Sequence, residues 1–373
     1  MKNLKKLLAV LLAAALCLSL AACYNENNTW AAKDDDETLP IGSYIYFLNN
    51  AFTEARSEVS SDTEVAKATI DGSAAKDWIQ NRAVDYVKAY FYLKSQLKAA
   101  DKALTEEELS DASSTTDYLW TYYKAQMEEM GVAKSSLDKA YSVYGAMYAK
   151  YFDVLYGEDG QQAVSEEEIH KYYDENYYYY DTFYAPLTTT DDDGNSVDLS
   201  DDEKTKLQSD LEAAAKEILA GEDMATVAEK FAKDHEGEDA SSHYAAATSG
   251  AKDTINATMA EALGQHQEGD VFVVQVSGSS YVVRKLSLAD GFTAAKETES
   301  TIDSIRHALK DEEYEELVRT NGHDFTGCTV NTAALGTVDW GKFVTDDNKM
   351  GTKTAESSEA AESSESSESS TAE

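Results

Sequence analysis

The sequence has little proline and few basic residues. Only 2 of its 373 residues are proline, and this scarcity of helix-breaking residues favours long helices. Lysine and arginine number 32 against 70 acidic residues, which gives a net charge of −38. Such a chain lacks the basic surface that displaces counterions from nucleic-acid phosphates, so no nucleic-acid partner is expected. A solvated acidic surface is the simplest interpretation.

Patterns typical of cofactor or metal sites are also missing. There is no glycine-rich phosphate loop, and no nucleophile has a base near it in sequence. The six histidines show no paired metal-ligand spacing; they are His170, His235, His243, His266, His307 and His323. We therefore expect neither a metal nor a cofactor.

No apolar run reaches the roughly 20 residues that a membrane-spanning helix needs. The candidate, Leu7–Leu20, follows Lys2, Lys5 and Lys6, as in a secretory signal peptide. It ends in Leu20-Ala21-Ala22-Cys23, which resembles a bacterial lipobox. That resemblance implies a signal peptide at 1–22 and a diacylglycerol anchor on Cys23. An ordinary signal peptide, with Cys23 incidental, is the alternative.

Cysteine is scarce as well. Of the 3 cysteines, Cys17 lies in the signal and Cys23 is the predicted lipid attachment site. Cys328 then has no partner for an intramolecular disulfide, although exported proteins often use such bonds. With no base beside it in sequence, Cys328 is interpreted as a buried structural thiol.

Polar segments flank the body of the chain. Residues 23–38 are rich in Asn and Asp and predict a flexible tether. Residues 346–373 end in a stretch of almost only Ser, Glu, Ala, Thr and Lys, which cannot bury a core and predicts a disordered tail.

Residues 39–163 have helical periodicity. Apolar residues recur at three- and four-residue steps, and helices are expected near 44–55, 74–103, 114–130 and 136–156. A capping box begins at Thr105, and Gly131 suits a left-handed helix end. One side of the last of these helices carries a row of tyrosines, namely Tyr141, Tyr144 and Tyr148, which we call the tyrosine stripe. It has two interpretations: the rings are part of the packed core, or they make amphipathic contacts with unfolded polypeptide.

The period changes after residue 164. Ser165 and Glu168 form a second capping box, which predicts a linking helix at 164–176. The aromatic-rich run Tyr177–Ala185 instead suits a half-buried strand. Beyond it we expect helices at 200–220, 221–234 and 257–263, a loop through His235–Gly250, and strands at Val271 and Ser280–Leu286.

This order resembles the parvulin-type peptidyl-prolyl isomerase domain. Gly221–Asp234 is similar to that family's G-[DE]-D-F-x-x-L-A-x-x-[FY]-S-x-D segment, and Gln267–Val271 to its L-x-x-G-[ED]-[VI]-S turn. With the export signal and the helical region, the chain resembles PrsA-like foldase lipoproteins of Gram-positive bacteria, which are related to the chaperone SurA.

The resemblance implies an α+β fold. A mostly helical chaperone domain would be built from residues 39–163 and 291–345, with a parvulin-like α/β domain inserted at 177–290. It also implies a lipid-anchored protein at the extracytoplasmic face of the cell membrane. The expected partners are unfolded or nascent exported polypeptides.

The resemblance also suggests site residues. Parvulins carry a His on the first strand, a second His on the last strand, and an acid or Cys closing the second helix. Here Asp234 takes the acid position, and is the one candidate catalytic residue. The proline-pocket positions are filled by Phe183, Tyr184, Ile255, Met259 and Tyr281.

Both expected histidines are absent, because the first-strand position falls on Phe183 or Tyr184 and the last-strand position on Tyr281 or Val282. We therefore expect the fold to be kept and isomerase activity to be weak or lost. His235 and His243 are possible replacements, so an active isomerase with a variant pocket is one alternative. A lipoprotein solute-binding receptor is another, but it requires two α/β lobes, and residues 41–160 show almost no strand–helix alternation.

Overall fold

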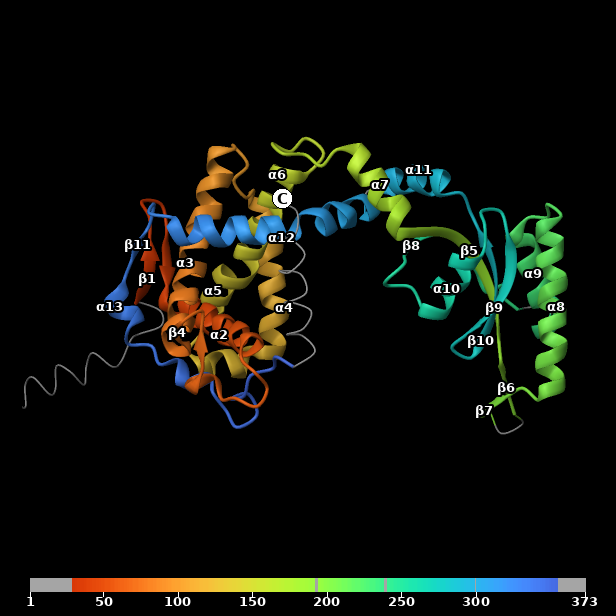
Figure 1. The fold of residues 1–373 in the computed structure, drawn as a ribbon. Helices are drawn as coiled ribbons and strands as arrows, with labels where there is room; N and C mark the ends of the chain where they lie inside the picture. Colours follow the sequence, from red (N-terminus) through yellow and green to blue (C-terminus); the bar gives the residue numbers. More distant parts are fainter. Residues whose placement is uncertain (1–28, 192–193, 238–239, 299, 355–373) are drawn as a thin grey trace, which may run out of the picture. The chain divides into compact units, whose positions relative to one another are not determined.

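The computed structural model describes residues 29–191, 194–237, 240–298 and 300–354. The described residues divide into two compact units, one formed by residues 29–162 with 312–354 and the other by residues in the range 163–311 (Figure 1). The predicted signal peptide, Cys23 and residues 355–373 of the predicted tail lie outside the described residues. Among the residues that are described, none of the helices has the length and apolarity needed to cross a membrane.

The α+β fold class is confirmed, and the first unit is the mostly helical one. Its core contains fully buried side chains such as Phe47, Phe91 and Phe152. The helices are α2 (Ile41–Glu58), α3 (Ala75–Ala99), α4 (Glu106–Met130), α5 (Lys134–Leu137), a π-helical segment (Asp138–Val143), α6 (Tyr144–Tyr156) and residues 312–324 of α12 (Ser300–Asp324).

Helix α4 starts earlier than the apolar periodicity predicts. The Thr105 hydroxyl accepts a hydrogen bond from the Glu108 amide (3.2 Å), and the Glu108 carboxylate accepts one from the Thr105 amide (2.7 Å). This reciprocal cap starts the helix at Glu106 rather than near residue 114. The helix ends at Gly131, whose φ of 88° is open to glycine without strain.

The predicted tether is wrong over its last residues. Strand β1 (Trp30–Lys33) pairs antiparallel with β2 (Thr38–Pro40) and with β11 (Thr329–Val330), so the two ends of the chain meet in one small sheet. Ala31 and Ala32 are fully buried. The intervening turn is held by α3, because Lys94 donates to Asp34 (3.0 Å) and Tyr90 to Glu37 (2.9 Å).

The predicted disordered tail starts too early. The Thr352 amide donates to the Arg56 carbonyl (2.6 Å), and the Lys353 amide to the Val59 carbonyl (3.0 Å). These backbone bonds hold residues up to 354 against the end of α2. The remaining short elements here are β3 (Thr69–Ile70), β4 (Ser73–Ala74), α13 (Thr332–Leu335) and a 3₁₀ turn (Trp340–Phe343).

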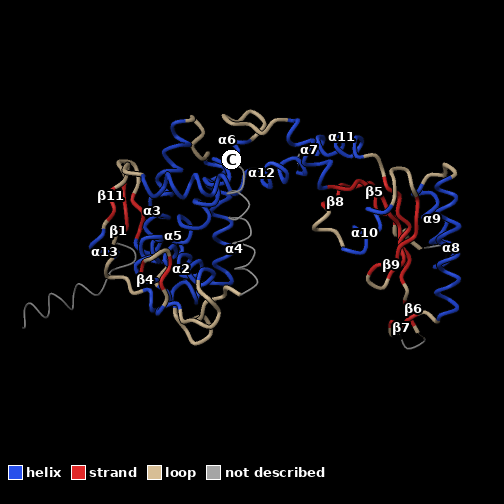
Figure 2. The backbone as a smooth tube through the Cα atoms, viewed as in Figure 1, coloured by secondary structure: helices blue, strands red, loops and turns tan. Residues whose placement is uncertain are grey.

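The second unit is built on an antiparallel sheet of order β8-β5-β10-β9 (Figure 2). Helix α7 (Glu166–Asn176) leads directly into β5 (Tyr177–Pro186), as the change of period predicts. Strands β9 (Val271–Val276) and β10 (Ser279–Lys285) form a hairpin. Strand β8 (Tyr244–Ala251) occupies the last part of the segment predicted as a loop, where Ala245–Ala247 lack the β-branched residues that favour a strand.

Helices cover both faces of this sheet. Helices α8 (Asp201–Leu219) and α9 (Met224–Glu236) pack on one face, and α10 (Ala257–Gln265) packs on the other. Helix α11 (Leu288–Thr298) contacts α7, β5 and β8, so residues 291–311 belong with this unit rather than with the helical one. The unit also contains a hairpin of β6 (Thr188–Thr190) and β7 (Ser196–Asp198).

Candidate functional site

Neighbouring residues of β5 point to opposite faces of the sheet, and this separates Phe183 from Tyr184. Phe183 is 1% exposed and lies in the core beneath α8 and α9, with its ring 5.5 Å from that of Phe231. Phe183 is therefore a core residue. Of the two candidates for the first-strand position, only Tyr184 faces the side covered by α10.

Tyr184 and Tyr281 lie side by side on that second face. They are cross-strand partners on β5 and β10, and their ring centroids are 5.2 Å apart. The imidazole of His243, the residue preceding β8, stacks on the Tyr184 ring at 4.5 Å with an interplanar angle of 19°. The strand pairing thus assembles two phenols and one imidazole from three separate parts of the sequence.

Helix α10 brings the apolar candidates to the same face. The Asn256 side chain caps the helix by accepting from the Thr258 amide (2.9 Å). Met259 is buried in the cluster beneath α10, and Ile255 and Tyr281 pack at its margin. We call this surface the tyrosine face; it comprises Tyr178, Tyr180, Tyr184, Tyr281, Ile255, Met259 and His243.

A glycine permits the close packing of this face. A Cβ at Gly250 would lie 2.7 Å from Cγ2 of Ile255 and 3.0 Å from the Tyr180 ring, so the loop before α10 approaches the sheet only because no side chain is there. Burial raises the pKa of Tyr180 above its ordinary value.

Two lysines frame the far end of the tyrosine face. The ammonium groups of Lys252 and Lys285 lie 5.0 and 5.1 Å from the Tyr178 ring centroid. Lys285 also donates to the carbonyls of Leu263 (2.8 Å) and His266 (2.7 Å), which closes the C-terminal end of α10. Burial lowers the pKa of Lys285.

Asp234 does not join the tyrosine face. Helix α9 continues through it to Glu236, and Asp234 is exposed beside a cavity of about 280 Å³ between α8 and α9. Those helices cover the opposite face of the sheet. His235 lies there too, stacked on Phe231 at 4.1 Å and 3.6 Å from an Asp210 carboxylate oxygen.

A buried ion pair joins β5 to β10. Arg284 donates to Asp181 through Nη2 (2.5 Å) and Nε (3.1 Å), and the Asp181 side chain is 1% exposed. The hydrogen bond to Asp181 raises the pKa of Arg284. Sequence analysis did not single out this pair. Its bidentate geometry on cross-strand neighbours indicates a role in fixing strand register.

The tyrosine face can contact apolar and aromatic groups and offer phenolic donors. The sequence carries one signal for this face, namely the histidine directly before β8. Within the described ranges, no group of three or more His, Cys, Asp or Glu side chains could hold a metal ion. Cys328 is half-buried, and burial raises the pKa of its thiol.

No family model and no curated protein sequence matches this chain. Among solved structures, it is similar to the foldase protein PrsA from Lactococcus lactis, with 13% identity over 85% of this chain and 100% of that one and a TM-score of 0.38. PrsA from Streptococcus pneumoniae matches with 12% identity over 72% and 96% of the two chains, at a TM-score of 0.36.

PrsA from Bacillus subtilis matches with 13% identity over 71% of this chain and 93% of that one, at a TM-score of 0.29. These are the foldases to which the sequence motifs also point. The chain is thus similar to PrsA foldase structures, at identities and TM-scores that leave its function to be argued from its own residues.

Proposed function

We propose that this protein is a lipid-anchored extracytoplasmic foldase that binds unfolded exported polypeptides. Support comes from the order of its sequence features: a signal with a lipobox ending at Cys23, a helical region, and a parvulin-like unit entered through Tyr177–Ala185. Tyrosine-rich surfaces on both units suit clients of varied sequence, because a phenol offers an apolar ring and a polar tip.

We further propose that isomerase activity in the second unit is weak or lost. The observation that carries this proposal is the tyrosine face itself, where Tyr184 and Tyr281 occupy the strand positions at which the family resemblance expects histidines. Asp234 is on the other side of the sheet, beside α8. Twisting a prolyl amide has a barrier of about 20 kcal/mol. Loss of the polar groups that are positioned to lower this barrier should therefore greatly reduce the rate of isomerisation.

A protease-coupled assay with a proline-containing peptide tests the second proposal. The chain from residue 24 onward should accelerate cis–trans exchange barely above the uncatalysed rate. Asp234→Ala should leave that residual rate unchanged, because Asp234 does not reach the tyrosine face. Robust turnover that Asp234→Ala abolishes would contradict the proposal.

One observation favours an active isomerase as the second candidate. His243 stacks on Tyr184, so an imidazole is present at the face although neither strand supplies one. If His243 is catalytic, the same assay gives substantial turnover that His243→Ala removes and Asp234→Ala does not. A solute-binding receptor has less support, because the described part of the first unit holds short strands and helices and no α/β lobe.

A further inference from the structure

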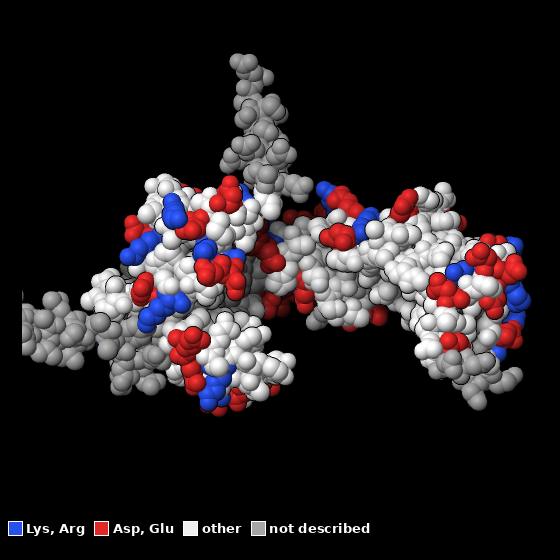
Figure 3. Space-filling view, turned by 90° about the horizontal axis from the view of Figure 1, so that it is seen from below, with Lys and Arg blue, Asp and Glu red and all other residues white. Residues whose placement is uncertain are grey.

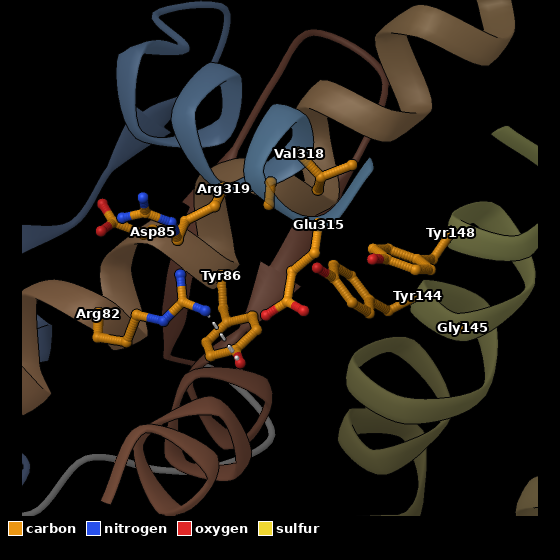
Figure 4. Close-up of a pocket in the computed structure, with 10 residues that line it drawn as sticks. Arg82, Asp85, Tyr86, Tyr144, Gly145, Tyr148, Glu315, Val318 and Arg319 are labelled. Atoms are coloured by element: carbon orange, nitrogen blue, oxygen red, sulfur yellow. Dashed lines mark hydrogen bonds between the residues drawn. The ribbon is translucent and has the colours of Figure 1, made fainter. Parts of the chain in front are cut away.

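The helical unit contains a cavity of about 280 Å³ that has no role in the function proposed above (Figure 4). Helix α3 contributes one wall, α6 the second, and residues 315–319 of α12 the third. Its size is just below the roughly 300–1,000 Å³ typical of small-ligand sites, so it suits one long side chain rather than a large cofactor.

Tyrosine rings form the apolar side of this cavity. Tyr86 of α3 and Tyr144 and Tyr148 of α6 line it, and the last two belong to the stripe that the sequence left open between core and polypeptide contact. Phe47 stacks on Tyr86 at 5.5 Å and lies edge-on to Tyr144 at 5.6 Å, and the Arg82 guanidinium covers the Tyr86 ring at 4.6 Å from its centroid. The rings are therefore fixed in place, with part of their surface facing the cavity.

The charged groups at the rim are paired, with one exception. The pairs are Arg82–Glu54 (2.6 Å), Arg319–Glu316 (2.8 Å) and Asp85–His323 (2.9 Å). Glu315 has no ion-pair or hydrogen-bond partner among the described residues. Figure 4 shows its side chain extending between the rings of Tyr86 and Tyr144.

The local field at the cavity is negative. Burial raises the pKa of Glu54, and the negative charge of Glu315 adds to this effect. A second cavity, of about 540 Å³, adjoins the first and shares four lining residues with it, namely Arg82, Asp85, Glu315 and Arg319. Its further lining includes Glu54, Glu58, Asp71 and Trp78. Acidic groups thus outnumber basic ones along the continuous surface.

We propose that this cavity binds the cationic side chain of a lysine or arginine in an extended polypeptide, with Glu315 as counter-ion and the rings of Tyr144 and Tyr148 as the aromatic wall. A cation over aromatic faces and beside a carboxylate gains two attractions in a partly desolvated site. An anionic side chain is disfavoured, because Arg82 and Arg319 are already paired and it would face Glu315. This inference rests on the proposed function, because it specifies which side chain of a client polypeptide the cavity binds.

Fluorescence anisotropy with labelled nine-residue Gly/Ser/Ala peptides tests it directly. The central residue is arginine or its neutral isostere citrulline, and the protein is the chain from residue 24 onward. The arginine peptide should bind about tenfold more tightly, in line with a desolvated cation–π contact plus a charge pair. Equal affinity for the two peptides would overturn the proposal.

Two substitutions locate the site. Glu315→Gln should remove most of the preference for arginine over citrulline. Glu129→Gln, an exposed change on α4 with the same effect on net charge, should keep it. If both variants lose the preference equally, the attraction belongs to the whole acidic chain and the proposal fails.

Gly145 offers a steric test on the cavity wall. A Cβ there meets nothing within 4 Å, and its φ is not in the left-handed region. Gly145→Leu should therefore occupy the cavity without disturbing α6 and weaken arginine-peptide binding at least about tenfold, if a cation–π contact is lost. Gly145→Ala, which adds only one methyl group to the cavity wall, should weaken binding much less than Gly145→Leu does. Unchanged binding by Gly145→Leu would contradict the assignment.

A permanently unfolded client separates this inference from the proposed function. A reduced, carboxymethylated protein should bind the wild-type chain and bind Gly145→Leu more weakly. If the client binds but arginine and citrulline peptides are not distinguished, the cavity proposal fails and the foldase proposal stands. If the peptides are distinguished and no unfolded client binds, the cation site stands and the foldase proposal fails.

Discussion

At the scale of single residues, the chemistry of the second unit depends on which face each β5 side chain takes. Aromatic residues occupy most positions of Tyr177–Tyr184, so the sequence gives no alternation from which to choose between Phe183 and Tyr184. The choice is made by packing, because the α8–α9 core takes Phe183. Asp234 was placed by its match to a motif, and it stays away from the tyrosine face because α9 packs on the opposite face of the sheet.

Glu37 provides a pH-dependent prediction at this scale. Burial raises its pKa, but the hydrogen bond from Lys139, with Lys94 and Tyr90 nearby, outweighs this and holds the pKa below 4.5. The folded state therefore binds this proton less readily than the unfolded state. The resulting stability is present above about pH 4.5 and is lost as the pH falls through the lower, folded pKa.

We expect Glu37→Gln to lower the free energy of unfolding of the helical unit near pH 7 and to make little difference near pH 3. Urea unfolding followed by tryptophan fluorescence measures this, because all 4 tryptophans lie within residues 1–162 and 312–373. A deficit of the same size at both pH values is the opposing result.

At the scale of elements, the helix capping boxes were the best predicted features. The predicted capping boxes at Thr105 and Ser165 both form, because each needs only residues three positions apart. The strands β1 and β8 were missed because pairing, not local propensity, creates them: β1 needs β11, some 300 residues later, and β8 needs β5. Such non-local partners leave no periodic signal in the segments themselves.

The packing of α2 on α5 gives an element-scale prediction. A Cβ at Gly42 would lie 2.5 Å from Oγ and 2.8 Å from Cβ of Ser136. Gly42→Ala should therefore cost about 1–3 kcal/mol by overpacking. Gly145→Ala, whose Cβ meets open space, should instead stabilise the helix by about 0.5–1 kcal/mol. Tryptophan-detected urea unfolding compares the two, and equal effects would show that the helices do not approach as described.

At the scale of the whole molecule, charge is the dominant property. The signal segment contributes three lysines and no acid to the total of −38, so the rest of the chain carries −41. On the face seen in Figure 3, the described acidic side chains are spread widely and basic ones lie in small groups among them. Because the excess of negative charge is distributed over the surface, it should act on a client through a long-range electrostatic field rather than through contacts at one place.

Client affinity should therefore depend on salt in opposite directions for opposite clients. Raising the salt concentration from about 0.05 M to about 0.5 M should weaken the binding of an unfolded basic protein and strengthen the binding of an acidic one. The reason is that salt ions screen both the attraction and the repulsion between the client and the acidic chain. Titrations of both clients, carboxymethylated and labelled, provide the comparison. Affinities that do not respond to ionic strength would refute the electrostatic part of the account.

The most direct test of the foldase proposal is light scattering during client aggregation. A basic protein, unfolded and reduced, is diluted into low-salt buffer with one equivalent of the chain from residue 24 onward. Strong suppression of scattering is predicted, with Gly145→Leu less effective than Gly145→Ala. Scattering as fast as with an inert acidic protein of similar charge would contradict the claim that this chain binds unfolded polypeptides.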